Sequence, residues 1–415
     1  MYIEQKKNTP EYLLTLFCIY ILCLPLLRYS ISVAEFGVTI SDFILVFLLL
    51  FTYRFRNKIH QSQKLYLWTI VIYAFVIIYL ALIKIISIGT YFANIFPLIY
   101  AILVTWVPFR IINHLTIEQI KKFKKYLNIS MLITFIPIYL QVFVMQIPSH
   151  FFMFGASKYR YFAVGSNQYA MYLFTMMAIS LFVSVKFFRN KLPMDLLVVA
   201  LALPPVFYTG SRTGTLIFLG LAVLNILLIF FKKGNKPKII LVLVLIFGAS
   251  YLQSFFEKGD IDWNIQRSLS FYEVFTSKDK ISVDDWREEH NTLALNHFKE
   301  HPIIGVGIGN YQKIDGHEVH NSYISLLTES GFLGLMFYLF IIIYFTYLYL
   351  KYNKNVLEIL YYIFLISLFL GASYSGLLLR ERWIWMMFSC ILSFSLYKSS
   401  NAVTANTHTE VNVSQ

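Results

Sequence analysis

The chain has 415 residues, of which 58% are hydrophobic and only 14% are charged. Soluble domains carry about 25% charged residues, so this composition excludes a soluble globular protein and indicates a multi-pass membrane protein. The formal net charge of +13 comes mainly from the loops between apolar segments, as membrane topology requires, and does not indicate nucleic-acid binding.

Twelve apolar segments approach the roughly 20 residues that a bilayer-spanning helix needs. No small-residue cleavage site follows the first segment, so we do not expect a cleavable signal peptide. The predicted fold class is an all-α polytopic membrane protein with about twelve transmembrane helices. The spans are predicted at residues 12–30, 38–53, 65–84, 91–108, 127–147, 167–185, 193–209, 213–231, 238–255, 331–350, 356–375 and 382–398.

The basic residues indicate how the chain crosses the membrane. If the N-terminus is cytoplasmic, most of the 35 Lys and Arg residues fall in inner loops, for example Lys121, Lys122, Lys124 and Lys125 before the fifth segment. Cytoplasmic loops of membrane proteins are enriched in Lys and Arg, whereas short outer loops are poor in them. We therefore predict that both termini are cytoplasmic.

A change of composition divides the chain. Residues 1–255 hold nine predicted spans, residues 256–330 form one large polar loop, and residues 331–398 hold the last three spans. By the charge pattern the large loop is external. The polar tail at 399–415 is predicted to be disordered and cytoplasmic.

The large loop is expected to contain a short helix. Between Val283 and His301 apolar residues such as Trp286 and Phe298 recur at helical spacing, which suits an amphipathic helix lying over the membrane core. Arg287 falls in its acidic first part. From spacing alone it is one charge of a solvated helix face.

The short outer turn Tyr208–Gly214, with the sequence YTGSRTG, precedes the eighth span. Ser211 or Thr213 could cap that span, whose N-terminus would then open toward the outside beside Arg212. A helix N-terminus together with a guanidinium suits an anion, above all a phosphate. A snorkelling arginine at a helix end is the alternative.

Several histidines follow in the segment His301–Gly334. The spacing of His317 and His320 is one residue short of a zincin pair, and the HExxH order is absent, so zinc is disfavoured. A neutral histidine whose pKa lies near working pH is a better general base for a hydroxyl nucleophile.

The glycines of GVGIGN, Gly305, Gly307 and Gly309, match neither a Walker A loop nor a dinucleotide fingerprint. We expect them to form a tight turn with close backbone approach. Acidic residues inside spans are scarce, since Asp42 and Asp195 lie near span ends. Without a chain of ionisable groups across the bundle, a proton- or sodium-coupled transporter is disfavoured.

Four motifs in the second half of the chain together resemble the O-antigen ligase/polymerase superfamily, bacterial membrane glycosyltransferases of the Wzy and WaaL type. They are GSRTG at 210–214, Arg287, HPIIGVGIGN at 301–310 and HNSYISLLTESGFLG at 320–334. A looser segment, Arg160 to Asn167, resembles the family's Arg, Gly and Asn pattern before a span.

The resemblance implies a GT-C-like helical protein of the bacterial inner membrane, with a periplasmic loop over the active site and no metal, nucleotide or other cofactor. Its donor would be an undecaprenyl-diphosphate-linked glycan. Arg212 and Arg287 would bind the donor diphosphate, and His320 would activate the acceptor hydroxyl. Arg160, Asn167, Ser211 and Asn321 are the further substrate-binding candidates, Asn321 and Ser322 also being candidate helix caps.

The first hypothesis is a polymerase that extends a lipid-linked glycan, with inversion at the anomeric carbon. A ligase that transfers the polymer to lipid A–core is the alternative within the family. A lipid-linked oligosaccharide flippase is a second alternative, although its charged lumen would line many spans. The expected partners are the glycan donor and acceptor, membrane lipids and a chain-length regulator protein, but no nucleic acid.

Overall fold

The computed structural model describes residues 9–24, 31–33, 36–54, 59–83, 88–139, 166–208, 211–231, 282–317, 319, 321–374 and 382–397. Almost all of these residues are helical. The only strands among them are β1 (Ile31–Val33) and β2 (Phe36–Val38), which pair antiparallel. The helical fold class is therefore confirmed for the described part of the chain.

The helices of the first half are α1 (Glu11–Cys23), α2 (Ile40–Arg54), α3 (Gln61–Ile83), α4 (Ile88–Ile111), α5 (Ile117–Tyr139), α6 (Ser166–Phe187), α7 (Leu192–Tyr208) and α8 (Arg212–Phe230). The second half has α12 (Ser282–Glu300), α13 (Asn310–Asp315), α14 (Ser322–Tyr352), α15 (Val356–Tyr374) and α16 (Arg382–Leu396). Two short 3₁₀ turns, Ile112–His114 and Arg189–Lys191, follow α4 and α6.

Each predicted span except the ninth overlaps one of these helices, although α5 and α14 begin several residues before the spans predicted for them. The ninth, 238–255, lies outside the described residues. Six of the described helices are long and apolar enough to cross a membrane, namely α3, α4, α6, α7, α8 and α14. Three further apolar helices, α1, α15 and α16, are shorter. The chain is thus a multi-pass membrane protein, and a total of twelve spans stays a prediction.

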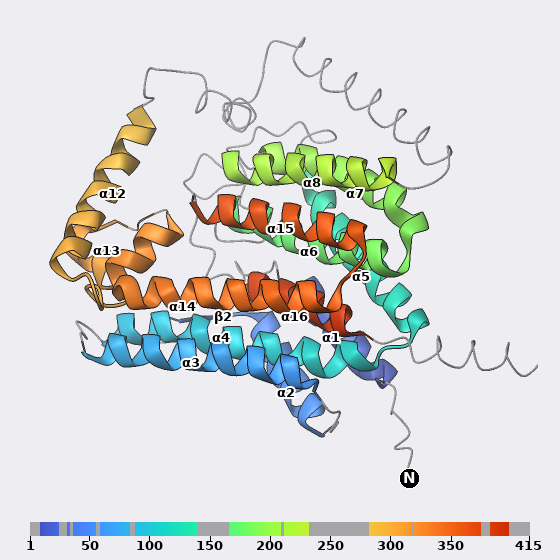
Figure 1. The fold of residues 1–415 in the computed structure, drawn as a ribbon, viewed down its shortest axis with the longest axis horizontal. Coiled ribbons are helices and arrows are strands. Elements are labelled where there is room, and N and C mark those ends of the chain that lie inside the picture. Colours follow the sequence, from blue (N-terminus) through green and yellow to red (C-terminus); the bar gives the residue numbers. More distant parts are fainter. Residues whose placement is uncertain are drawn as a thin grey trace, which may run out of the picture.

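The long helices lie side by side, whereas α12 crosses one end of the bundle at a steep angle with α13 next to it (Figure 1). Helix α6 packs against α5, α7, α8, α15 and α16, and α16 packs against α4, α6 and α14. These two helices therefore form the centre, and the others separate them from lipid.

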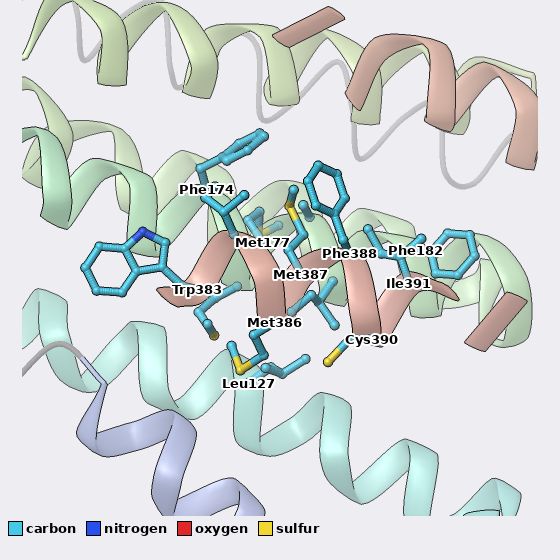
Figure 2. Close-up of a cluster of buried hydrophobic side chains, with 14 of the residues drawn as sticks. Leu127, Phe174, Met177, Phe182, Trp383, Met386, Met387, Phe388, Cys390 and Ile391 are labelled. Carbon is cyan, nitrogen blue, oxygen red and sulfur yellow. The ribbon is translucent and has the colours of Figure 1, made fainter. Parts of the chain in front are cut away.

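The central helices are buried on every side. All side chains from Tyr169 to Val185 in α6 and from Trp383 to Ser395 in α16 are buried. Figure 2 shows Trp383 and other α16 side chains between Phe174 and Met177 of α6 and Leu127 of α5. Because lipid tails are as apolar as leucine, close van der Waals packing holds such helices together, not exclusion from water.

One end of the bundle is tied by polar side chains, and we call it the basic end. The Ser62 hydroxyl of α3 lies 2.7 Å from the Tyr352 hydroxyl at the end of α14. Lys186, at the end of α6, donates to Asn353 Oδ1 at 2.8 Å and lies 3.7 Å from Glu358 Oε2 in the first turn of α15. The ends of α6 and α14 and the starts of α3 and α15 therefore lie together.

The opposite end, which we call the loop end, carries α12, α13 and the start of α14 (Figure 1). Helix α7 starts at the basic end, directly after α6, and packs against α8 along the bundle. Because the connection from α7 to α8 is short, α8 runs back in the opposite direction. Helices α8 and α14 thus both start at the loop end.

A buried ion pair joins α5, α6 and α7. Lys124 donates to Asp195 Oδ1 and, at 2.9 Å, to the Ser180 hydroxyl. The Asp195 side chain is fully buried and that of Lys124 nearly so. The sequence predicted Lys124 in a cytoplasmic segment before a span at 127–147; the fifth helix already begins at Ile117, so Lys124 lies within a helix, and its cytoplasmic side stays a prediction.

Breaking this pair should destabilise the protein. Asp195→Ala leaves a buried unpaired ammonium, so we expect the free energy of unfolding to fall by about 3–5 kcal/mol, whereas K124M/D195L should stay near wild type. Thermal unfolding in detergent measures both. The control is Glu11→Ala, which removes the exposed partner of Lys122 and should change nothing measurable. Equal stability of Asp195→Ala and Glu11→Ala would contradict the expectation.

Candidate functional site

The start of α8 carries the predicted helix cap. Ser211 is buried, has extended backbone, and its hydroxyl accepts the Gly214 N–H at 3.0 Å. A Cβ on Gly214 would lie 2.4 Å from Ala170 Cβ, so α8 begins in close contact with α6. Of the two candidate caps, Ser211 and Thr213, Ser211 is therefore the one used, and Arg212 is the first residue of the helix.

The start of α14 is capped in the same way. Asn321 is buried, and its side-chain oxygen accepts the N–H groups of Tyr323 and Ile324 at 3.0 and 3.2 Å. Of the two expected caps Asn321 is therefore the one used, and Ser322 is the first helical residue. His320 directly precedes this cap and lies outside the described residues.

Helix α14 is broken at Gly331, whose backbone is non-helical with φ 66° and ψ −165°. The break lies at the start of the predicted tenth span. A helix break frees carbonyls before it and N–H groups after it, and such groups are costly if they are buried without partners. In this chain the partners come from the segment after α12.

Four backbone hydrogen bonds join that segment to the broken helix. The N–H groups of Val306 and Gly307 donate to the carbonyls of Thr328 and Glu329 at 2.8 and 2.9 Å. In return, Phe332 N–H donates to the Pro302 carbonyl at 2.8 Å. The fourth bond runs from Leu333 N–H to the Ile303 carbonyl at 3.3 Å. Residues 302–307 thereby satisfy both sides of the break.

Two glycines allow the backbones to approach. A Cβ on Gly305 would lie 2.5 Å from the Thr328 carbonyl oxygen, and one on Gly331 would lie 2.3 Å from that of Ile303. Both residues have a φ of 66°, a conformation that other residues rarely adopt. The prediction of a tight turn with close backbone approach is therefore confirmed. We call this contact the glycine interlock.

Helix α12 confirms the amphipathic helix expected between Val283 and His301, and it packs against α14. The Thr328 hydroxyl donates to the Ala294 carbonyl at 3.0 Å, which fixes α12 beside the glycine interlock. Ala294 belongs to a small buried cluster over this end of α14, together with Val306, Tyr311 and Val319.

A polar cluster joins α12 to α13. His290 Nδ1 lies 2.6 Å from Asp315 Oδ2, and the Tyr311 hydroxyl lies 3.0 Å from the same oxygen. The rings of His290 and His317 meet edge to face with their centroids 4.6 Å apart. Burial, reinforced by the Asp315 carboxylate, raises the pKa of Tyr311, so its hydroxyl stays protonated and can donate.

The structure describes the predicted site residues to different extents. Arg212 starts α8, Arg287 lies in the first half of α12, and Asn167 lies in the first turn of α6, but their side chains are outside the described part. His320 and Arg160 are outside it altogether. Within the described residues, no three His, Cys, Asp or Glu side chains gather in a way that could hold a metal.

Sequence reasoning missed His290, Asp315 and Thr328. Their partners are far along the chain, Asp315 being 25 residues from His290, and Ala294 being 34 residues from Thr328. No spacing rule connects residues so separated, because the turn between α12 and α13 decides which side chains meet. The acidic residues at the start of α12 were the only nearby feature that the sequence analysis singled out. They indicated a solvated helix face and gave no sign of a contact with α13.

The fold and this end of the bundle define a multi-pass membrane protein whose polar loop is locked by its backbone onto a transmembrane helix. Residues 196–339 match the family model described as O-antigen ligase. The match includes the four motifs that suggested the superfamily and excludes Arg160 and Asn167. No curated protein matches the chain.

This match over residues 196–339 supports the resemblance to the O-antigen ligase/polymerase superfamily that the motifs suggested. That family indicates a glycosyltransferase or ligase activity. The matched residues include α8, α12, α13 and the first part of α14. These are the helices that start at, or cross, the loop end.

The glycine interlock should tolerate no side chain. We expect Gly305→Ala and Gly331→Ala to destabilise the protein strongly, because the added Cβ meets backbone atoms. In Gly316→Ala only the positive φ of 79° is penalised, since nothing lies within 4 Å of the new Cβ; that strain costs about 1–2 kcal/mol.

Unfolding temperature and the monodisperse fraction on size-exclusion chromatography measure this series. Gly371→Ala in α15 is the control, because its Cβ also meets nothing within 4 Å and its φ is not positive. If Gly331→Ala unfolds at the same temperature as Gly371→Ala, the interlock does not carry the stability assigned to it.

Proposed function

We propose that the protein is an inner-membrane glycosyltransferase that polymerises undecaprenyl-diphosphate-linked repeat units on the periplasmic face. The observation that supports the proposal is that two capped helix starts, those of α8 and α14, lie at the same end of the bundle (Figure 1). One begins with Arg212, and the other directly follows His320. The interlock and α12 attach the segment with Arg287 to the same end.

The charge distribution supports a periplasmic loop end. Lys186 and Lys351, for example, lie at the basic end, where α6 and α14 finish. Lysine and arginine collect on the cytoplasmic side of membrane proteins. With the basic end in the cytoplasm, both helix starts face the compartment in which lipid-linked glycans are extended in this superfamily.

The start of α8 suits the donor diphosphate. A helix N-terminus carries a positive partial charge and N–H groups that bind anions. Arg212 adds a full charge there, and Arg287 would add a second. In the reaction the bond between the anomeric carbon and a diphosphate oxygen breaks, and the leaving diphosphate takes the electron pair. Two guanidiniums would stabilise that charge.

His320 supplies the base in this proposal. It takes the proton from the acceptor hydroxyl while that oxygen forms the new bond to the anomeric carbon. Attack opposite the leaving diphosphate inverts the configuration of this carbon. The growing glycan passes to the next lipid-linked unit, undecaprenyl diphosphate is released, and these residues require no metal ion for any step.

Single substitutions test the assigned roles. We expect His320→Ala and Arg212→Ala to lower the rate of chain extension at least about 100-fold, because a base or a charge-stabilising donor contributes that much or more. Polymer formed in a complemented deletion strain measures the effect, with membrane levels of each variant confirmed by immunoblot.

Two matched controls accompany these variants. His301→Ala removes an exposed histidine of the same segment, and Arg54→Ala removes an exposed arginine at the end of α2. Both should extend chains like wild type. Full activity of His320→Ala or Arg212→Ala would exclude the mechanism.

The ligase is the second candidate, favoured by the description of the matched family. Lipopolysaccharide from a deletion strain separates the activities. We expect lipopolysaccharide with a single repeat unit, which indicates a polymerase. Lipid-linked polymer together with bare core would indicate a ligase. Repeat units held on the cytoplasmic leaflet would indicate a flippase.

A further inference from the structure

The pair His290–Asp315 is a short side-chain contact between α12 and α13. His290 Nδ1 lies 2.6 Å from Asp315 Oδ2, and only 12% and 16% of the two side chains are exposed. The Tyr311 hydroxyl lies 3.0 Å from the same carboxylate oxygen and 3.1 Å from the His290 carbonyl. One carboxylate thus joins both helices.

The place of this pair along the chain is informative. Arg287 precedes His290 by one turn of α12, and Asp315 is the last residue of α13. Only a short connection, beginning at Gly316, separates Asp315 from His320 and from Asn321, the cap of α14. The pair therefore joins the helix that carries Arg287 to the helix that precedes His320 in the chain.

The connection after Asp315 needs such an attachment. Gly316 has a φ of 79°, and nothing lies within 4 Å of the position of a Cβ there. Its N–H donates to the Gln312 carbonyl at 2.9 Å, which ends α13, but no side chain of the described residues packs over the turn. The chain is fixed again at Asn321, which caps α14. Between these points the ring of His317 rests against His290. The contact with His290 thus holds His317, three residues before His320 in the sequence.

We propose that His290 and Asp315 are positioning residues, which hold the segment of Arg287 and the segment of His320 at a fixed separation during glycan transfer. This inference rests on the proposed function. Transfer needs base, acceptor and leaving group aligned within about 0.5 Å, and a misplacement of about 1 Å can cost roughly 100-fold in rate. The pair acts through Arg287 and His320 and does not itself contact substrate.

A second histidine–carboxylate contact provides the matched comparison. His297 Nδ1 lies 3.5 Å from Glu300 Oε2, but both belong to α12, and the Glu300 side chain is 66% exposed. This pair joins no two segments. Removing its carboxylate makes the same chemical change as removing that of Asp315, without opening a contact between helices.

The test compares His290→Ala, Asp315→Ala and their double variant with the control Glu300→Ala. Elongation is followed in membrane vesicles of the producing strain, at saturating and at limiting lipid-linked repeat unit. We expect kcat to fall at least about tenfold in each single variant with KM nearly unchanged, and the double variant to fall no further. Glu300→Ala should behave like wild type.

A conservative replacement of His290 distinguishes a positioning role from an effect on the stability of the whole protein. His290→Asn keeps an N–H donor near the position of Nδ1 and should restore most of the rate. An unchanged kcat in His290→Ala, or no recovery in His290→Asn, overturns the proposal. So does a loss of activity accompanied by a lower unfolding temperature, since that shows a merely structural role.

Hydrogen exchange on the purified protein gives a readout that needs no substrate. His290→Ala and Asp315→Ala should speed exchange at residues 313–322, while the interlocked N–H groups of Phe332 and Leu333 stay protected. Unchanged exchange at 313–322 overturns the proposal even if the enzyme is a polymerase. If the deletion strain makes normal polymer, the proposed function fails instead, and the exchange result still decides whether the pair holds the segment.

Discussion

The loop end depends on one interaction, the backbone contact between the break in α14 at Gly331 and residues 302–307. A break near the membrane leaves peptide groups that lipid cannot satisfy. The loop supplies partners on both sides of it, which is possible only because Gly305 and Gly331 lack side chains. The segment after α12 thereby becomes a rigid extension of a transmembrane helix.

Other features of the loop end follow from this attachment. Thr328, three residues before the break, also holds α12 through the Ala294 carbonyl. Helix α13 then closes against α12 through Asp315 and Tyr311. The chain emerges from these contacts at the cap of α14, so residues that are distant in sequence arrive at one end of the bundle.

The two ends of the bundle differ in their chemistry. At the basic end, polar side chains pair with one another and so join helices, as Lys186 of α6 and Glu358 of α15 do. At the loop end, Ser211 and Asn321 cap the N-termini of α8 and α14, each of which carries a positive partial charge. Capped helix N-termini of this kind suit an anionic group, while the paired side chains at the other end hold helices together.

Local chemistry in the sequence alone determined where most helices lie, two candidate caps for each of α8 and α14, and the amphipathic α12. These depend on hydropathy, on helical spacing and on contacts within a few residues. Only the tertiary structure decided that α6 and α16 are central, that Lys124 meets Asp195, and that Gly305 meets Gly331. In each case the partners lie on different helices, and their meeting depends on how the whole bundle packs, which no local pattern contains.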